Sequence, residues 1–60
     1  MTEAEARGIA TNYIKKFFPG ALPEYIGDDQ QFFFYSVRFE VGYRNYGVLK
    51  ANGKVLPCPQ

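Results

Sequence analysis

The sequence predicts an α+β fold in which one N-terminal helix packs on a small antiparallel sheet of three to four strands. Apolar residues recur at three- and four-residue spacing over positions 2–18, as in an amphipathic helix. Residues 31–41 instead alternate with a period of two, as a half-buried strand does. Shorter strand-like segments with Gly and Asn between them follow. A helix followed by a β-meander can bury both apolar faces against each other.

The length of 60 residues fits one domain, residues 1–60, with a limited core. One cysteine allows no internal disulfide, and the lack of histidine removes the commonest metal ligand and general base. Six Phe and five Tyr supply the apolar mass instead. We therefore expect aromatic packing to stabilise the domain and to leave some aromatic surface for a partner.

The helix is predicted over residues 2–18. Thr2 followed by Glu5 forms the capping-box pattern, which satisfies free amides at a helix start. Pro19 and Gly20 are typical of a helix end. The apolar stripe consists of Ala6, Ile9, Ala10, Tyr13, Ile14, Phe17 and Phe18.

Residues 23–27 are predicted to form a short edge strand or an extended segment, because Pro23 lacks the amide hydrogen that a central strand requires. A turn then leads into the long strand, residues 31–41. Its core face is expected to carry Phe33, Tyr35, Val37, Phe39 and Val41. Its other face carries Phe32, Phe34, Ser36, Arg38 and Glu40. That second face is expected to lie away from the helix.

The chain is expected to reverse near residues 41–45, where Gly42 and Asn45 occur. A strand over 45–51 follows. Within it, Gly47 indicates either a bulge or a place where a neighbouring side chain crosses the backbone.

The dipeptide Asn52-Gly53 predicts a type I′ hairpin turn, which needs positive φ at both central residues. A last strand is predicted over residues 54–56. Residues 57–60 contain two prolines, so we expect them to form an extended tail outside the sheet.

Charge and catalytic chemistry exclude several classes of function. The formal charge is +1, the N-terminus does not have the pattern of a secretory signal, and no apolar run is long enough to span a membrane. We therefore expect a cytoplasmic protein without membrane association. Cys58 lies between prolines with no histidine to activate it, and Asp28-Asp29 with Glu24 supplies few oxygens for a metal. No catalytic, cofactor-binding or metal-binding residues are predicted.

The aromatic residues outside the predicted core are the candidate partner-binding site. It comprises Phe32, Phe34, Arg38, Tyr43 and Tyr46. Exposed aromatic residues on a small sheet are typical of protein contacts. An alternative is single-stranded nucleic acid, with Phe32, Phe34 and Tyr46 stacking on bases and Arg38, Arg44 and Lys50 on phosphates. The near-neutral charge makes nucleic acid the less favoured partner.

The order of motifs resembles a PepSY-type domain. A helix ending in Pro19-Gly20-Ala21 precedes a strand with Tyr35 and Val37. A closing segment then has the sequence Asn52-Gly53-Lys54-Val55. The resemblance covers about three quarters of the chain and implies a protein that restrains peptidases, in an exported or membrane-linked setting. The chain is also similar to small helix-plus-meander immunity proteins and phage-encoded inhibitors.

These observations predict a small non-catalytic protein-binding module, an inhibitor or regulator of a peptidase, toxin or host enzyme. A structural component of a larger assembly, such as a phage particle, remains open. A homodimer through the aromatic sheet face or a strand edge is also predicted, because one helix covers only one face of the sheet.

Overall fold

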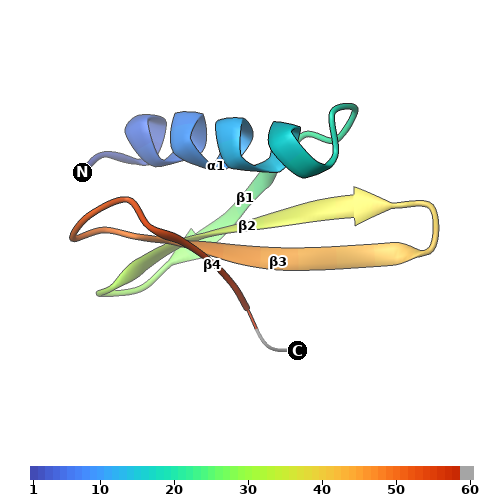
Figure 1. Cartoon of the computed structure of the whole chain (residues 1–60). Helices are drawn as coiled ribbons and strands as arrows, with labels where there is room; N and C mark the ends of the chain where they lie inside the picture. Colours follow the sequence, from blue (N-terminus) through green and yellow to red (C-terminus); the bar gives the residue numbers. More distant parts are fainter. Residues whose placement is uncertain (59–60) are drawn as a thin grey trace.

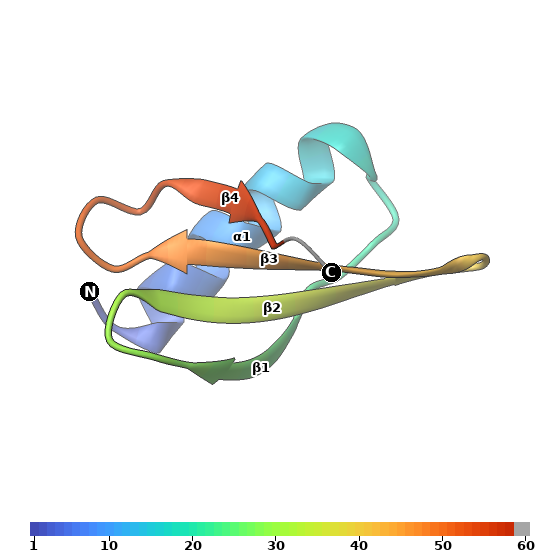
Figure 2. The same ribbon diagram turned by 90° about the horizontal axis from the view of Figure 1, so that it is seen from below.

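The computed structural model describes residues 1–58 and has two layers, one helix on one sheet (Figures 1 and 2). Its elements are α1 (Glu3–Phe17), β1 (Glu24–Asp28), β2 (Phe32–Phe39), β3 (Gly42–Leu49) and β4 (Val55–Pro57). The strands lie antiparallel in the order β1-β2-β3-β4. The predicted α+β class and meander are confirmed.

Helix α1 begins at the predicted capping box. The Thr2 hydroxyl accepts a hydrogen bond from the Glu5 amide at 3.2 Å, and the Thr2 amide donates to the Glu5 carboxylate at 2.8 Å. Phe18 is the C-cap, and its amide donates to the carbonyl of Ile14 at 2.8 Å. The helix predicted over residues 2–18 therefore matches the structure to within a residue at each end.

The core lies between α1 and the facing side of β2 and β3. Its buried residues are Ala6, Ala10, Ile14, Phe33, Tyr35, Val37, Tyr46 and Val48. Ala6 and Ala10 of α1 form one buried cluster with Phe33, Tyr35 and Val48 of the sheet. The predicted core face of the long strand is confirmed at Phe33, Tyr35 and Val37, and the half-buried Phe39 packs against Phe18 with ring centroids 4.7 Å apart.

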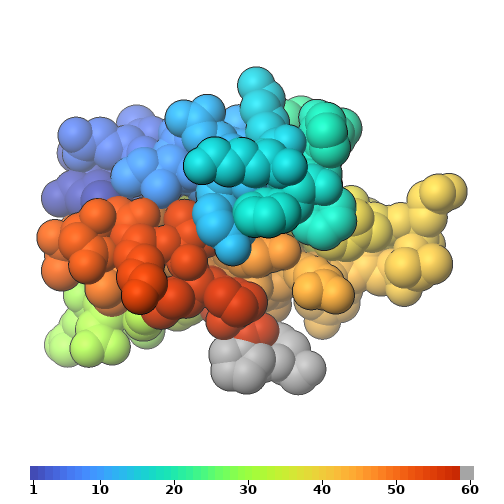
Figure 3. Space-filling view, in the orientation of Figure 1, coloured from blue at the N-terminus to red at the C-terminus, as the bar shows by residue number. Residues whose placement is uncertain are grey.

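Val41 does not belong to the core and is 99% exposed, which corrects the prediction. Strand β2 ends at Phe39, which pairs with Gly42, so Glu40 and Val41 form a two-residue loop. The β2–β3 hairpin extends past the end of α1, so no helix residue covers its tip (Figures 1 and 3). The alternation in the sequence therefore continues beyond the part of the hairpin that the helix covers.

The β2–β3 turn lies earlier in the sequence than predicted, and this changes the bounds of both strands. β2 is shorter than the predicted 31–41, and β3 spans Gly42–Leu49 rather than 45–51. Gly42, expected within the reversal, is the first residue of β3. β1 agrees with the edge strand predicted over 23–27 to within a residue at each end, with an irregularity between Tyr25 and Gly27.

The β3–β4 connection is not the predicted type I′ turn. Gly53 has φ 76, but Asn52 does not have positive φ. Residues 50–54 connect the two strands, and the Gly53 amide donates to the carbonyl of Leu49 at 2.7 Å. The Asn52 side chain accepts from the Lys54 amide at 2.9 Å. Asn52 thus contributes a side-chain acceptor, and only the glycine takes the left-handed conformation.

The extended tail predicted over residues 57–60 is wrong at Pro57, which is the last residue of β4. The Cys58 amide also donates to the carbonyl of Asn45 at 2.9 Å. β4 lies at the sheet edge, and the Pro57 nitrogen is on the side away from β3. The lack of an amide hydrogen on this nitrogen therefore removes no hydrogen bond between the two strands. Residues 59–60 lie outside the described residues.

Candidate functional site

The side of the sheet that faces away from α1, here called the far sheet face, carries a group of apolar side chains. Phe32 lies opposite Leu49, and Phe34 lies opposite Gly47. Gly47 in turn lies opposite Leu56 on β4. Successive side chains of a strand point to opposite faces, so these residues point away from the core. Phe32, Phe34, Leu49 and Leu56 therefore surround Gly47, and we call these four residues the apolar patch.

The two phenylalanine rings of the apolar patch lie against the backbone of β3. A Cβ atom added to Gly47 would be 2.9 Å from Cδ1 of Phe32 and 3.5 Å from Cε1 of Phe34. The ring centroids are 5.8 Å apart. This geometry confirms the second of the two interpretations of Gly47, a close crossing by neighbouring side chains. All four patch residues keep some exposed surface, and Leu56 is 36% exposed.

Arg38 and Tyr43 form a separate group at the hairpin end of the far sheet face. They lie opposite each other in the β2–β3 register, and both side chains are exposed. Ser36 and Asn45, which are partly buried, separate this pair from the apolar patch. The structure thus brings Phe32 together with Phe34, and Arg38 together with Tyr43.

Tyr46 lies on the opposite side of the sheet, so its predicted place beside Phe32 and Phe34 is wrong. It is only 6% exposed and packs edge-on against Tyr13 of α1, with ring centroids 5.9 Å apart. The two-residue hairpin loop pairs Tyr46 with Tyr35, which gives both residues the same face.

Leu49 and Leu56 complete the apolar patch, and the sequence analysis missed both. Leu49 has the same parity as Gly47 along β3 and could have been found from it. Leu56 could not, because its partner depends on the β3–β4 register.

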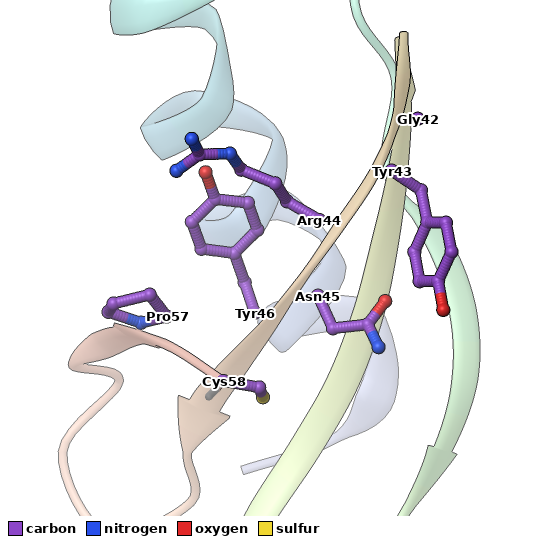
Figure 4. Close-up of a pocket in the computed structure, with 7 residues that line it drawn as sticks. All are labelled: Gly42, Tyr43, Arg44, Asn45, Tyr46, Pro57 and Cys58. Carbon is purple, nitrogen blue, oxygen red and sulfur yellow. The ribbon is translucent and has the colours of Figure 1, made fainter. Parts of the chain in front are cut away.

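A hollow of about 490 Å3 lies beside the hairpin half of β3 (Figure 4). Residues Gly42–Tyr46 of β3, together with Pro57 and Cys58, line it. Arg44 and Tyr46 point to one side of the strand, and Tyr43 and Asn45 point to the other. The Oδ1 atom of Asn45 is buried and has no hydrogen-bond partner among residues 1–58.

Two further groups of polar contacts connect elements of the fold. The Tyr35 hydroxyl donates to the Glu3 carboxylate at 3.0 Å, beneath the start of α1, and Arg7 pairs with the same carboxylate at 3.0 Å. The Lys50 ammonium lies 2.7 Å from Asp28, and hydrogen bonds from Lys50 and then Tyr25 lower the pKa of that carboxyl. These contacts join α1 to β2, and the β3 end to β1.

Catalytic and metal chemistry is limited in the described part of the chain. Burial raises the pKa of the Cys58 thiol, which opposes the thiolate form that a nucleophile needs. Within residues 1–58, no group of three or more His, Cys, Asp or Glu side chains is arranged to hold a metal ion. No helix in the same range is long and apolar enough to cross a membrane.

Comparisons with known proteins find no match for this chain among protein-family models, curated proteins or solved structures.

Proposed function

We propose that this protein is a small non-catalytic binding module that acts on another protein through the far sheet face. The observation that carries the proposal is the apolar patch. Its four side chains lie on the face that α1 leaves uncovered, and the Phe32 and Phe34 rings already pack against the backbone at Gly47. A preformed apolar surface loses little side-chain freedom when a partner covers it, which favours binding. Arg38 and Tyr43 supply a polar end next to it, as the rim of a protein interface does.

The distribution of basic residues favours a protein over single-stranded nucleic acid. Arg38 points to the far sheet face, whereas Arg44 points to the helix side of β3. Lys50, the third predicted phosphate contact, forms an ion pair with Asp28. Tyr46, predicted to stack on a base, is in the core. The aromatic and basic groups that nucleic-acid binding requires therefore do not share one surface.

A non-catalytic role is supported by the state of the one thiol. Burial favours the neutral form of Cys58, and the chain has no histidine to act as its base. Inhibition or regulation of a peptidase, toxin or host enzyme is the specific form that we propose for the interaction. A structural role in a larger assembly would use the same surface, and a cytoplasmic location remains a prediction.

The proposal is tested by affinity capture from a host lysate with wild type and Phe34→Asp. The substitution places a charge in the apolar patch and is expected to abolish capture of the specific partner while the fold is retained. Phe17→Asp makes the same chemical change at a ring that is 59% exposed on α1, and it should leave capture intact. A folded Phe34→Asp variant that retains every partner would exclude the far sheet face.

A further inference from the structure

The hairpin end of the molecule exposes apolar side chains from two elements that lie far apart in the sequence. Phe17 ends α1, Phe18 is its C-cap, and Val41 lies in the two-residue loop between β2 and β3. All three line one hollow of about 600 Å3 between the helix end and the hairpin. All three side chains are also exposed. We call Phe17, Phe18 and Val41 the apolar end.

Val41 projects from the rest of the molecule. It lies at the turn of a hairpin that extends beyond α1, and almost none of its surface contacts the chain (Figures 1 and 3). A residue that protrudes in this way can enter a soft apolar phase without a matching pocket. Proteins that lie on a membrane bury Phe rings at the boundary between headgroups and acyl chains. The shape and the side chains of the apolar end therefore suit a lipid surface.

Basic side chains lie beside the apolar end. Lys15 and Lys16 are in the last turn of α1, and Arg38 lines the same hollow as the apolar end. All three are exposed, and Glu40 is the only acidic residue among those that line the hollow. None of the three basic side chains forms an ion pair within residues 1–58. This end therefore carries an excess of positive charge that attracts an anionic surface.

The total charge conceals this excess because most acidic residues lie at the other end. Glu3 and Glu5 are in the first turn of α1, and Asp28 and Asp29 are at the turn from β1 to β2. Both places are at the opposite end of the molecule from the β2–β3 hairpin (Figure 2). The chain as a whole has a formal charge of only +1. An anionic surface would therefore attract the hairpin end in preference to the other one.

We propose that the apolar end binds the surface of an anionic lipid bilayer, with Val41 inserted and the basic side chains at the headgroups. The stems of Lys15 and Lys16 are long enough to keep the ammonium groups at the headgroups while the neighbouring rings lie deeper. The sequence predicts no membrane association because it has no apolar run that could span a bilayer, but contact with a membrane surface needs no such run. The cytoplasmic leaflet is anionic, so the predicted cytoplasmic location agrees with this surface.

The probe is a lipid vesicle, of phosphatidylcholine alone or with added phosphatidylserine, which is sedimented with the full chain. We expect binding to the anionic vesicles to exceed binding to the neutral ones at least about tenfold, because each basic side chain near an anionic surface contributes about fivefold. Added salt should weaken this binding, since it screens the charges. Absence of binding to the anionic vesicles, or equal binding to both kinds, would overturn the proposal.

Two matched variants test the insertion of Val41. Val41→Asp and Ala51→Asp make the same change in charge at exposed residues, in connections at opposite ends of β3. Val41→Asp should weaken binding to anionic vesicles at least about tenfold, because an apolar side chain no longer enters the bilayer. Ala51→Asp should leave binding nearly unchanged. Equal weakening by the two variants would show that only the total charge matters and would contradict insertion.

A second pair of variants separates local charge from total charge. Lys16→Gln and Lys54→Gln each remove one positive charge from an exposed side chain. Lys16→Gln should weaken vesicle binding about fivefold, and Lys54→Gln, in the β3–β4 connection, should not weaken it. An equal loss for both would refute the role of the basic residues beside the apolar end.

Two controls distinguish the apolar end from a surface that binds another protein. Phe34→Asp should leave vesicle binding unchanged, so failure of the apolar end and failure of the far sheet face give different results. Affinity capture from a host lysate with wild type and Val41→Asp is the second control, and we expect both to capture the same proteins. A protein that is lost with Val41→Asp, when wild type binds no vesicle, would assign the apolar end to a protein partner and overturn the proposal.

Discussion

The hydrogen bond between Tyr35 and Glu3 gives a quantitative test of how the helix is joined to the sheet. The Tyr35 side chain is fully buried, and its hydroxyl donates to the Glu3 carboxylate at 3.0 Å. Tyr35→Phe removes this bond and keeps the ring. Arg7 still pairs with the carboxylate, so we expect the low end of the range for charged partners, a loss of about 1.5 kcal/mol. For so short a chain that corresponds to a fall in Tm of roughly 6–12 °C.

The pH dependence of this loss has a defined sign. Burial, then the hydrogen bond to Glu3 and its negative charge, raise the pKa of Tyr35 well above its ordinary value. Below pH about 10 the phenol is neutral in both folded and unfolded chains, so its contribution to stability is fully present. Above that pH only the unfolded chain ionises, and wild type should lose about 1.4 kcal/mol more than Tyr35→Phe between pH 9 and 11.

Urea unfolding of both variants at pH 8, 9 and 11, followed by circular dichroism, measures these differences. Tyr43→Phe is the matched control, because it removes a hydroxyl from a tyrosine that is 64% exposed. It should not change the free energy of unfolding at pH 8. Equal unfolding free energies for wild type and Tyr35→Phe at pH 8, or parallel pH profiles above pH 9, would refute the assignment of this contact.

Three further predictions concern the helix start, the apolar patch and self-association. Thr2→Ala removes the hydroxyl that caps α1 and should lower the free energy of unfolding in urea by about 1 kcal/mol. An unchanged free energy of unfolding would show that the capping box does not contribute to stability. Gly47→Val places a side chain where the Phe32 ring lies and should destabilise by about 1–3 kcal/mol, and an unchanged Phe32 environment in NMR spectra would contradict the close crossing. Without a partner, the far sheet face should pair with a second copy, so sedimentation equilibrium at micromolar concentrations should give twice the chain mass. Phe34→Lys should return monomer, and a strictly monomeric wild type would exclude the dimer.

The helix could be predicted from local features of the sequence. Thr2 and Glu5 satisfy each other across one turn, and the apolar stripe needs only the period of the helix. Phe33, Tyr35 and Val37 were likewise found from alternation within one strand. Such features involve residues close in sequence, so they do not depend on the tertiary arrangement.

The positions of Val41 and Tyr46 could not be predicted in the same way. Both depend on where the β2–β3 hairpin turns, and the sequence offers Gly42 and Asn45 as turn residues although Glu40 and Val41 form the loop. Placing the turn a few residues later leaves the face of Tyr46 undetermined, because side chains alternate with a period of two. The apolar patch was therefore predicted only in its β2 half, Phe32 and Phe34.

Site-specific photocrosslinking tests the binding role of the far sheet face most directly. Phe34 is replaced by a benzophenone-bearing phenylalanine, and the protein is irradiated in host cells. The same group at Asn12, which is exposed on α1, is the control. The proposed function predicts a covalent adduct with one foreign protein from position 34 and none from position 12. The absence of an adduct at position 34, or the same adduct from both positions, would contradict it.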